Sequence, residues 1–158
     1  MQNINYIKGE PRHISQVLGL IKELAVYEKA GDEVAITEEE LHEDAFGKDA
    51  IVDFFVAERG DEVLGFAMYY TKYSTWKGKC IYLEDFLVKE SERGNGIGQQ
   101  LFKMVMQVAV EKNAGRMEWQ VLDWNEPAIN FYKKMHATLD GEWLNGKFTR
   151  EQLQKLCS

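Results

Sequence analysis

Two adjacent acidic residues, Glu84 and Asp85, interrupt the apolar segment YLEDFLV, which has the composition of a β-strand. Burying a carboxylate in such a strand costs free energy unless the charge has a partner or a chemical task. One such task is to accept a proton from an amine, because only a deprotonated amine is a nucleophile. An ion pair with a neighbouring lysine or arginine is the alternative explanation of Glu84.

Regular alternation along this strand predicts that Glu84 and Asp85 point to opposite faces of the sheet. We therefore expect that the two acids do not share a proton, which disfavours an aspartic protease or a glycosidase. The expected faces are Tyr82, Glu84 and Phe86 on one side and Leu83, Asp85 and Leu87 on the other.

The segment RGNGIGQQLF, from Arg93 to Phe102, follows the strand and places three glycines directly before a helical pattern. Glycines let a ligand approach the backbone, and the N-terminus of a helix offers N–H groups to an anion. The segment lacks the third glycine of a dinucleotide-binding loop and the lysine of a P-loop, since Gln99 follows Gly98. It predicts a phosphate-binding loop of another kind, and a tight strand-to-helix connection is the alternative.

The elements that must position these groups follow from hydrophobic periodicity and from turn and capping residues. Thr37 and Glu40 form the pattern of a capping box, and Asn125 stands where a helix cap is expected. The order of elements predicts a mixed α/β fold with an antiparallel middle, not a doubly wound fold. We expect strands over 4–9, 51–73 (two strands with a turn at 59–61), 79–88 and 116–122, helices over 11–28, 37–46, 97–113 and 125–135, and one or two strands and a terminal helix in 138–156.

Composition narrows the class of protein further. The 158 residues, 45% of them hydrophobic, fit a single domain spanning 1–158. The net charge of −7 disfavours nucleic acid as a partner and favours a cationic one. No stretch is long and apolar enough to span a membrane, so we expect a cytoplasmic protein. The two cysteines, Cys80 and Cys157, and the scattered His13, His42 and His136 predict neither a disulfide framework nor a metal site.

The pattern Arg93-x-x-Gly96-x-Gly98, between a strand and a helix, resembles the pyrophosphate loop of the GNAT superfamily of N-acetyltransferases. Further blocks resemble its spermidine/spermine (diamine) and thialysine N-acetyltransferase branch. These blocks are LIKELAVYE, TEEELHEDAFG, GFAMYYTKYSTWKGKCIYLEDF and WNEPAINFYKK. The resemblance extends from about Leu20 to Lys134 and becomes weaker after Met135. It implies the GNAT acyl-CoA N-acyltransferase fold, in which helices flank a twisted, mostly antiparallel sheet.

The resemblance also implies a function. It implies direct transfer of an acetyl group from acetyl-CoA, without a metal, to a primary amine of a small cationic molecule, and a homodimer. The amine belongs to a polyamine, a diamine or a lysine-like molecule, and spermidine, putrescine, thialysine and an aminoglycoside all stay open. The alternative is a non-catalytic acyl-CoA-binding regulatory module.

Roles for individual residues come from the same resemblance. It implies that Glu84 accepts the proton of the amine and that Tyr132 protonates the departing thiolate; without it, Tyr132 is a core aromatic residue. Amides at a strand irregularity around Leu87 and Val88 would hold the developing oxyanion. The implied cofactor-binding residues are Phe86, Leu87, Val88, Arg93, Gly94, Asn95, Gly96, Ile97, Gly98, Gln99, Asn125, Pro127, Asn130 and Lys133. The implied substrate-binding residues are Tyr27, Glu28, Trp76, Asp85, Glu118 and Trp119, of which Glu28 is alternatively a solvated helix end and Asp85 a structural residue.

Overall fold

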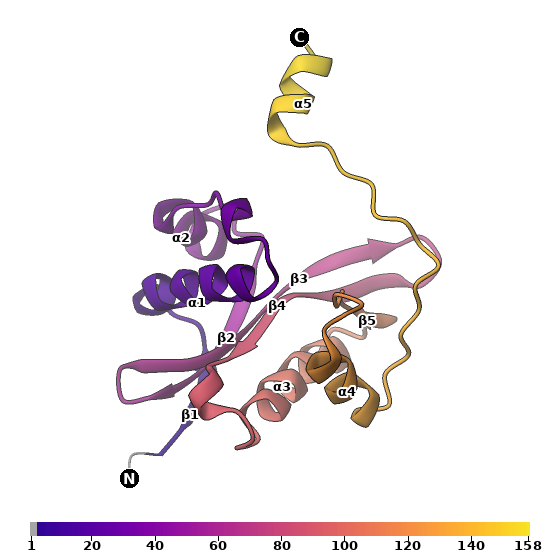
Figure 1. The fold of residues 1–158 in the computed structure, drawn as a ribbon. Helices are drawn as coiled ribbons and strands as arrows, with labels where there is room; N and C mark the ends of the chain where they lie inside the picture. The colour runs from indigo at the N-terminus through magenta and orange to yellow at the C-terminus, as the bar shows by residue number, and fades with distance from the viewer. Residues whose placement is uncertain (1–2) are drawn as a thin grey trace. The chain divides into compact units, whose positions relative to one another are not determined.

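The computed structural model describes residues 3–158 (Figure 1). The chain forms two compact units. The first unit runs up to Gln120, and the second extends from Val121 to Ser158. The first unit holds the sheet and three of the longer helices, whereas the second holds two short helices. A single domain formed by both units stays a prediction.

A five-stranded sheet forms the centre of the first unit, with the strands in the spatial order β1-β2-β3-β4-β5. Neighbouring strands are antiparallel, except that β5 pairs parallel with β4. This mostly antiparallel sheet confirms the expected fold class, although β5 is shorter than the strand expected over 116–122. The strands are β1 (Asn5–Lys8), β2 (Asp53–Arg59), β3 (Glu62–Ser74), β4 (Gly78–Val88) and β5 (Arg116–Glu118).

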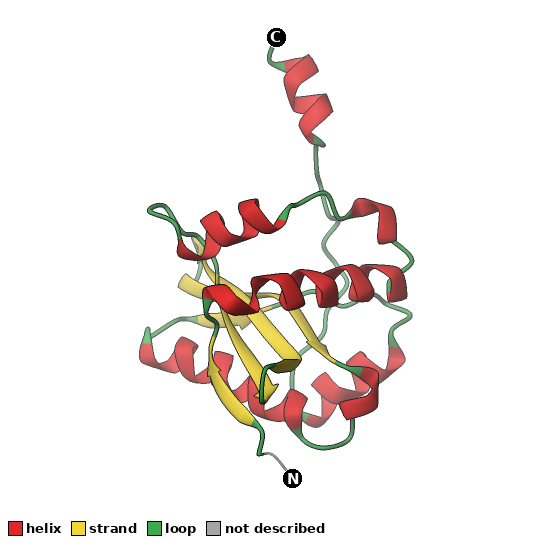
Figure 2. Ribbon diagram, turned by 90° about the vertical axis from the view of Figure 1, so that its left-hand side faces the viewer, coloured by secondary structure: helices red, strands yellow, loops and turns green. Residues whose placement is uncertain are grey.

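Helices cover both faces of the sheet (Figure 2). On one face α1 (Ile14–Tyr27) and α2 (Glu38–Phe46) pack against β2, β3 and β4, and on the other face α3 (Ile97–Glu111) packs through Phe102 against Phe86. The capping box of α2 is confirmed, because Thr37 Oγ1 accepts a 3.1 Å hydrogen bond from the Glu40 N–H. Short 3-10 helices, η1 (Pro11–His13), η2 (Gly31–Glu33) and η3 (Glu90–Glu92), complete the first unit.

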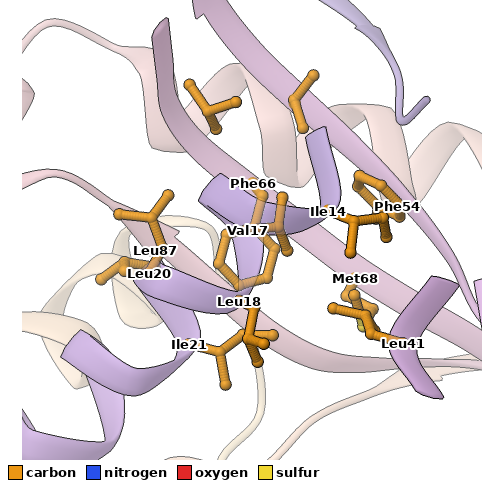
Figure 3. Packing of buried hydrophobic residues seen from close by; sticks show 12 residues of the cluster. Ile14, Val17, Leu18, Leu20, Ile21, Leu41, Phe54, Phe66, Met68 and Leu87 are labelled. Atoms are coloured by element: carbon orange, nitrogen blue, oxygen red, sulfur yellow. The ribbon is translucent and has the colours of Figure 1, made fainter. Parts of the chain in front are cut away.

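The apolar stripe of α1 forms the core with the sheet (Figure 3). Val17, at the centre of this stripe, and Phe66 of β3 are fully buried. Burial of apolar surface of this kind is the dominant favourable contribution to folding. Because Leu87 of β4 belongs to the same cluster, α1 is fixed against the strand that carries Glu84 and Asp85.

The second unit contains α4 (Glu126–Lys134) and α5 (Arg150–Leu156). The terminal helix was expected, but the structure places no residue between Met135 and Thr149 in a strand. A strand needs a neighbour to satisfy its backbone hydrogen bonds, and the apolar Trp143, Leu144 and Phe148 are exposed instead. None of the helices from residue 3 to the C-terminus combines the length and the apolar character of a membrane span.

Candidate active site

The glycine loop before α3 leaves a row of backbone N–H groups available. None of the N–H groups from Gly94 to Gln99 donates to an acceptor within residues 3–158, and the first that does is Gln100, which donates to the Gly96 carbonyl at 3.1 Å. Helix N-termini lack acceptors for their first amides, and here the row begins in the preceding loop. Together with the positive end of the α3 dipole, these amides form a site suited to a polyvalent anion.

The three glycines of the loop are there for two different reasons. Gly94 and Gly96 have φ angles of 82° and 80°, the left-handed region that favours glycine, although a Cβ at either would meet nothing within 4 Å. At Gly98 the reason is space, because a Cβ there would lie 3.3 Å from Cζ of Phe86. The first two glycines therefore shape the loop, and Gly98 lets the first turn of α3 approach β4.

A hydrogen bond joins the loop to the end of β4. Arg93 donates from Nε to the Val88 carbonyl at 3.1 Å, and Asn95 donates from Nδ2 to the Glu92 carbonyl at 3.3 Å. Both contacts use side chains, so they leave the amides of the loop available. The anion site is thereby held beside the last residues of the strand that carries Glu84.

β4 is longer than β5, its neighbour on one edge, so part of that edge is unpaired within residues 3–158. β5 pairs with β4 only from Cys80 to Tyr82, and the described chain has no strand next to this edge from Leu83 to Val88. On the other edge, the Lys89 N–H donates to the Leu64 carbonyl at 2.8 Å. Antiparallel pairing alternates, so it directs the N–H of Leu87 towards β3 and those of Phe86 and Val88 towards the open edge.

The open edge changes one expectation about the oxyanion. The expected strand irregularity around Leu87 and Val88 is wrong, because these residues pair regularly with Phe66 and Gly65. The irregularity lies at Glu84, three residues before Leu87. The N–H of Leu87 is directed towards β3. Of Leu87 and Val88, which were expected to supply amides, Val88 alone directs its N–H away from β3. Phe86, which was not expected to supply an amide, also directs its N–H away from β3.

Glu84 has no pairing partner on β3, so β4 contains one residue more than β3 at this point. Asp85 pairs with Met68 of β3, while Leu83 pairs with Tyr69, so that Glu84 forms a β-bulge between them. The expected regular alternation is therefore wrong. Residues paired across a sheet share a face, so Asp85 lies on the α1 face with Tyr82, and Leu83 lies on the opposite face with Phe86. The side chain of Glu84 is exposed.

Three carboxylates gather around this bulge. Burial, together with the negative charges of Glu84 and Glu28, raises the pKa of Asp85 to about 7. Burial also raises the pKa of Glu28, which directly follows α1. The two acids of β4 were expected to be separated by the sheet, yet they influence each other. A cation bound among the three carboxylates would relieve this repulsion.

Next to the carboxylates lies a group of side chains that the sequence analysis largely missed. The rings of Tyr70 and Tyr82 lie 5.3 Å apart, and the Lys72 ammonium lies 5.5 Å from the centre of the Tyr82 ring. Glu118 accepts ion pairs from Lys72 at 3.2 Å and from Arg116 at 3.0 Å. Only Glu118 was expected at the site, since the group depends on the register of three strands and no short motif marks it.

The aromatic residues expected to bind substrate lie in three different places. Tyr27 is the last residue of α1 and is half-exposed, next to Glu28. Trp76 is exposed in the turn between β3 and β4. Trp119 contacts the ring of Phe102 at 5.3 Å and therefore lies on the α3 side of the sheet. The structure thus brings Tyr27 towards the carboxylates and leaves the two tryptophans apart from them.

The remaining expected residues belong to the second unit. Asn125 caps α4, because its Oδ1 accepts a 3.4 Å hydrogen bond from the Ala128 N–H, and Pro127 stands in the first turn, as expected. Asn130, Tyr132 and Lys133 follow on the same helix, and the rings of Tyr132 and Phe131 lie 5.5 Å apart. The described residues contain no group of three histidine, cysteine or acidic side chains that could hold a metal ion.

Comparisons with known proteins agree with this architecture. The sequence profile of the Acetyltransferase (GNAT) family matches residues 20–137, and the chain belongs to this family. It is 42% identical to thialysine N-epsilon-acetyltransferase of Bos taurus over 151 residues, which cover 89% of each chain. It is 37% identical to spermidine/spermine N(1)-acetyltransferase-like protein 1 of Homo sapiens, over 87% of this chain and 21% of that protein.

A solved structure supports the fold directly. The integron cassette protein VCH_CASS6 from the mobile metagenome of V. cholerae superposes with a TM-score of 0.79 over 99% of both chains, at 30% identity. Together, the sequence profile, the relatives and this structure confirm the resemblance on which the expected fold was based.

Proposed function

We propose that this protein transfers the acetyl group of acetyl-CoA directly to a primary amine of a small molecule, either lysine-like or a polyamine. The observation that carries the proposal is the row of unbonded N–H groups from Gly94 to Gln99 beside the open edge of β4. Family membership and the names of the relatives support the same chemistry. The charge of the cluster formed by Glu28, Glu84 and Asp85 favours a cationic amine as acceptor.

The residues present fit acetyl-CoA, which supplies a thioester as acyl donor. The amides of Gly94 to Gln99 would bind its pyrophosphate, and the left-handed conformations of Gly94 and Gly96 shape the loop that carries them. Backbone groups of Phe86 and Val88, directed to the open edge, would hold the pantetheine arm and stabilise the negative charge that develops on the thioester oxygen. Further proposed contacts are Leu87, Arg93, Asn125, Pro127, Asn130 and Lys133.

Two proton transfers complete the proposed reaction. An amine with a pKa near 10 arrives as an ammonium ion and has to lose a proton before it attacks. We assign that proton to Glu84, directly or through water, while Asp85 and Glu28 hold the cation nearby. Tyr132 returns a proton to the departing thiolate.

The amine subsite would lie at the end of α1. Tyr27 and Glu28 come from this helix, and Asp85 and Glu118 from the face of the sheet that it covers. Trp76 and Trp119 complete the proposed set, although the sheet separates Trp119 from Asp85. An acidic site of this kind recognises the ammonium group and leaves the rest of the substrate to neighbouring residues.

We further propose a homodimer located in the cytoplasm. Exposed apolar residues of the second unit, Trp143, Leu144 and Phe148, offer surface for association with a second copy. Cys80 and Cys157 are free thiols, as is usual in a reducing compartment. Light scattering should give the mass of two chains for the parent, and Leu144→Asp should shift it towards one. A parent mass of one chain contradicts the dimer.

The proposed activity is tested by following free thiol while the protein is incubated with acetyl-CoA and a panel of amines. The panel contains thialysine, spermidine, putrescine and an aminoglycoside. We expect amine-dependent release of thiol and an acetylated product with at least one member. If acetyl-CoA binds but no amine releases thiol above the background hydrolysis, the protein is a binding module and the proposed activity is wrong.

A further inference from the structure

The group formed by Lys72, Tyr82, Arg116 and Glu118 carries charge of the opposite sign to the acidic cluster. Glu118 contributes one negative charge, whereas Lys72 and Arg116 contribute two positive ones, both within 3.2 Å of its carboxylate oxygens. This group therefore has a net positive charge. The acidic cluster of Glu28, Glu84 and Asp85 contains only carboxylates.

Asp85 of the acidic cluster lies on the same face of the sheet as this second group. Met68, Tyr70 and Lys72 are every second residue of β3 and therefore share a face, and Met68 pairs with Asp85. Tyr82 pairs with Tyr70 on one side and with Glu118 on the other. The charges of both Glu84 and Glu118 contribute to raising the pKa of Tyr82 to about 12, after burial, so this ring lies within reach of both groups.

The separation of the two groups is that of a short, extended molecule. Lys72 and Met68, the residue that pairs with Asp85, are four residues apart along β3, which corresponds to about 13 Å in a strand. An amino acid with an amine at the end of its side chain has a similar length once its contacts at both ends are included. Its side-chain ammonium would meet the carboxylates, and its α-carboxylate would meet Lys72 and Arg116.

We propose that Lys72 and Arg116 bind the α-carboxylate of the acceptor, which makes the substrate a lysine-like amino acid and not a polyamine. The inference rests on the proposed function and specifies the substrate class of the same site. Glu118 both orients the two cations and accepts the α-ammonium group. A diamine of equal length places its second ammonium beside two positive charges and is disfavoured.

Lys72 also occupies the position that a second ammonium would need. Its Nζ lies over the Tyr82 ring and against Glu118, an arrangement of aromatic face and carboxylate that suits any ammonium group. The protein thus fills this position with its own side chain. Removing Lys72 should make the position available to a diamine.

The test compares thialysine with the diamine obtained by removing its carboxylate, at saturating acetyl-CoA. For the parent we expect kcat/KM at least about tenfold higher for thialysine, as for a charged hydrogen bond lost with the carboxylate. Lys72→Met should lower kcat/KM for thialysine about tenfold, and should raise it about threefold for the diamine by removing a like charge. Lys72→Arg should restore most of the preference.

Lys79→Met is the matched control, because Lys79 is an exposed lysine of the same hairpin that pairs with Tyr73 on the opposite face. It should leave the ratio of the two kcat/KM values unchanged. Equal kcat/KM values of the parent for both acceptors, or an equal loss for both in Lys72→Met, would overturn the inference while leaving the acetyltransferase activity intact. Absence of transfer to any amine would instead overturn the proposed function, and this inference with it.

Discussion

Asp85 on β4 and Glu28, the residue after α1, carry like charges close enough for Glu28 to raise the pKa of Asp85. Burial is the main cause of this shift, and Glu84 contributes as well, so that the pKa rises from 3.8 to about 7. The α1 helix and the bulge in β4 thus bring together three acids that a regular strand would have divided between two faces.

The raised pKa predicts how Asp85 affects stability at different pH values. Between pH 4 and pH 7 the carboxyl group of Asp85 is protonated in the folded chain and ionised in the unfolded chain, so stability falls as the pH rises. Ionisation of Asp85 therefore lowers the free energy of unfolding by about 2–4 kcal/mol above pH 7 and does not affect it below pH 4. We expect Asp85→Asn to raise the Tm by about 5–10 °C at pH 8 and to leave it unchanged at pH 4.

Thermal unfolding followed by circular dichroism at pH 4, 6 and 8 measures this effect. Asp49→Asn, which changes an exposed acid in the loop after α2, is the control and should give no gain that grows with pH. A gain of equal size for Asp85→Asn at pH 4 and pH 8 would show that packing, and not ionisation, is responsible.

The loop before α3 offers a comparison between two glycines with the same conformation. Gly96 and Gly78 have φ angles of 80° and 79°, and a Cβ at either would meet nothing within 4 Å. Alanine should therefore destabilise both positions by a similar amount, about 1–2 kcal/mol. Only Gly96 belongs to the proposed pyrophosphate site, so only Gly96→Ala should also raise the Kd for coenzyme A, by about tenfold.

Isothermal titration calorimetry with coenzyme A measures the affinity, and urea unfolding measures the stability of both variants. The Gly78→Ala variant serves as control, because Gly78 is the first residue of β4 and does not belong to the loop before α3. If both variants bind coenzyme A as the parent does, the amides before α3 do not hold its pyrophosphate.

The pattern of apolar residues was sufficient to predict most of the elements of the first unit. The stripe from Ile14 to Ile21 gave α1, and Thr37 with Glu40 gave the start of α2, because both signals are local. The glycines after β4 likewise predicted a loop that presents amides. Each of these conclusions depends on the backbone preference or spacing of neighbouring residues.

The bulge at Glu84 could not be predicted in this way. The segment YLEDFLV has the same letters whether or not one residue is left without a pair, and pairing with β3 decides which. The group of Lys72, Tyr82 and Glu118 was hidden for the same reason, because its members meet only through the register of three strands. The strands expected in the tail failed because strand propensity does not supply a neighbouring strand.

We expect two arginine–glutamate pairs to contribute differently to the stability of the fold. Glu58 accepts two 2.9 Å hydrogen bonds from Arg12 and one from His13, and its side chain is only 7% exposed. Glu92 accepts two from Arg59 at 2.8 and 3.0 Å, in a more exposed position. Glu58→Gln should lower the free energy of unfolding by about 2–4 kcal/mol, and Glu92→Gln should lower it clearly less.

Urea unfolding at pH 7 and pH 3.5 tests this contrast. The hydrogen bonds from Arg12 and His13 lower the pKa of Glu58, so its contribution is present at neutral pH and is lost as the pH falls through that pKa. The difference between Glu58→Gln and the parent should accordingly be smaller at pH 3.5. Similar losses for both variants at pH 7 would mean that burial adds nothing to the Glu58 contacts.

Removing the proposed base should change the pH dependence of the reaction. A carboxylate accepts a proton only when ionised, so kcat/KM of the parent should fall at acidic pH. In Glu84→Gln we expect a lower rate and an acidic limb that is flattened or lost. Glu39→Gln, on the exposed surface of α2, is the control, and a Glu84→Gln profile identical to that of the parent would refute the assignment.

Tyr132 should act only in the transition state, when the thiolate departs. We expect Tyr132→Phe to lower kcat at least about tenfold with little change in the Kd for acetyl-CoA, which is the pattern of a lost transition-state interaction. Tyr73→Phe removes the hydroxyl of an exposed tyrosine and should leave kcat unchanged. Because phenylalanine keeps the ring that contacts Phe131, an unchanged kcat in Tyr132→Phe would exclude the hydroxyl from the mechanism and leave the ring as a packing element of α4.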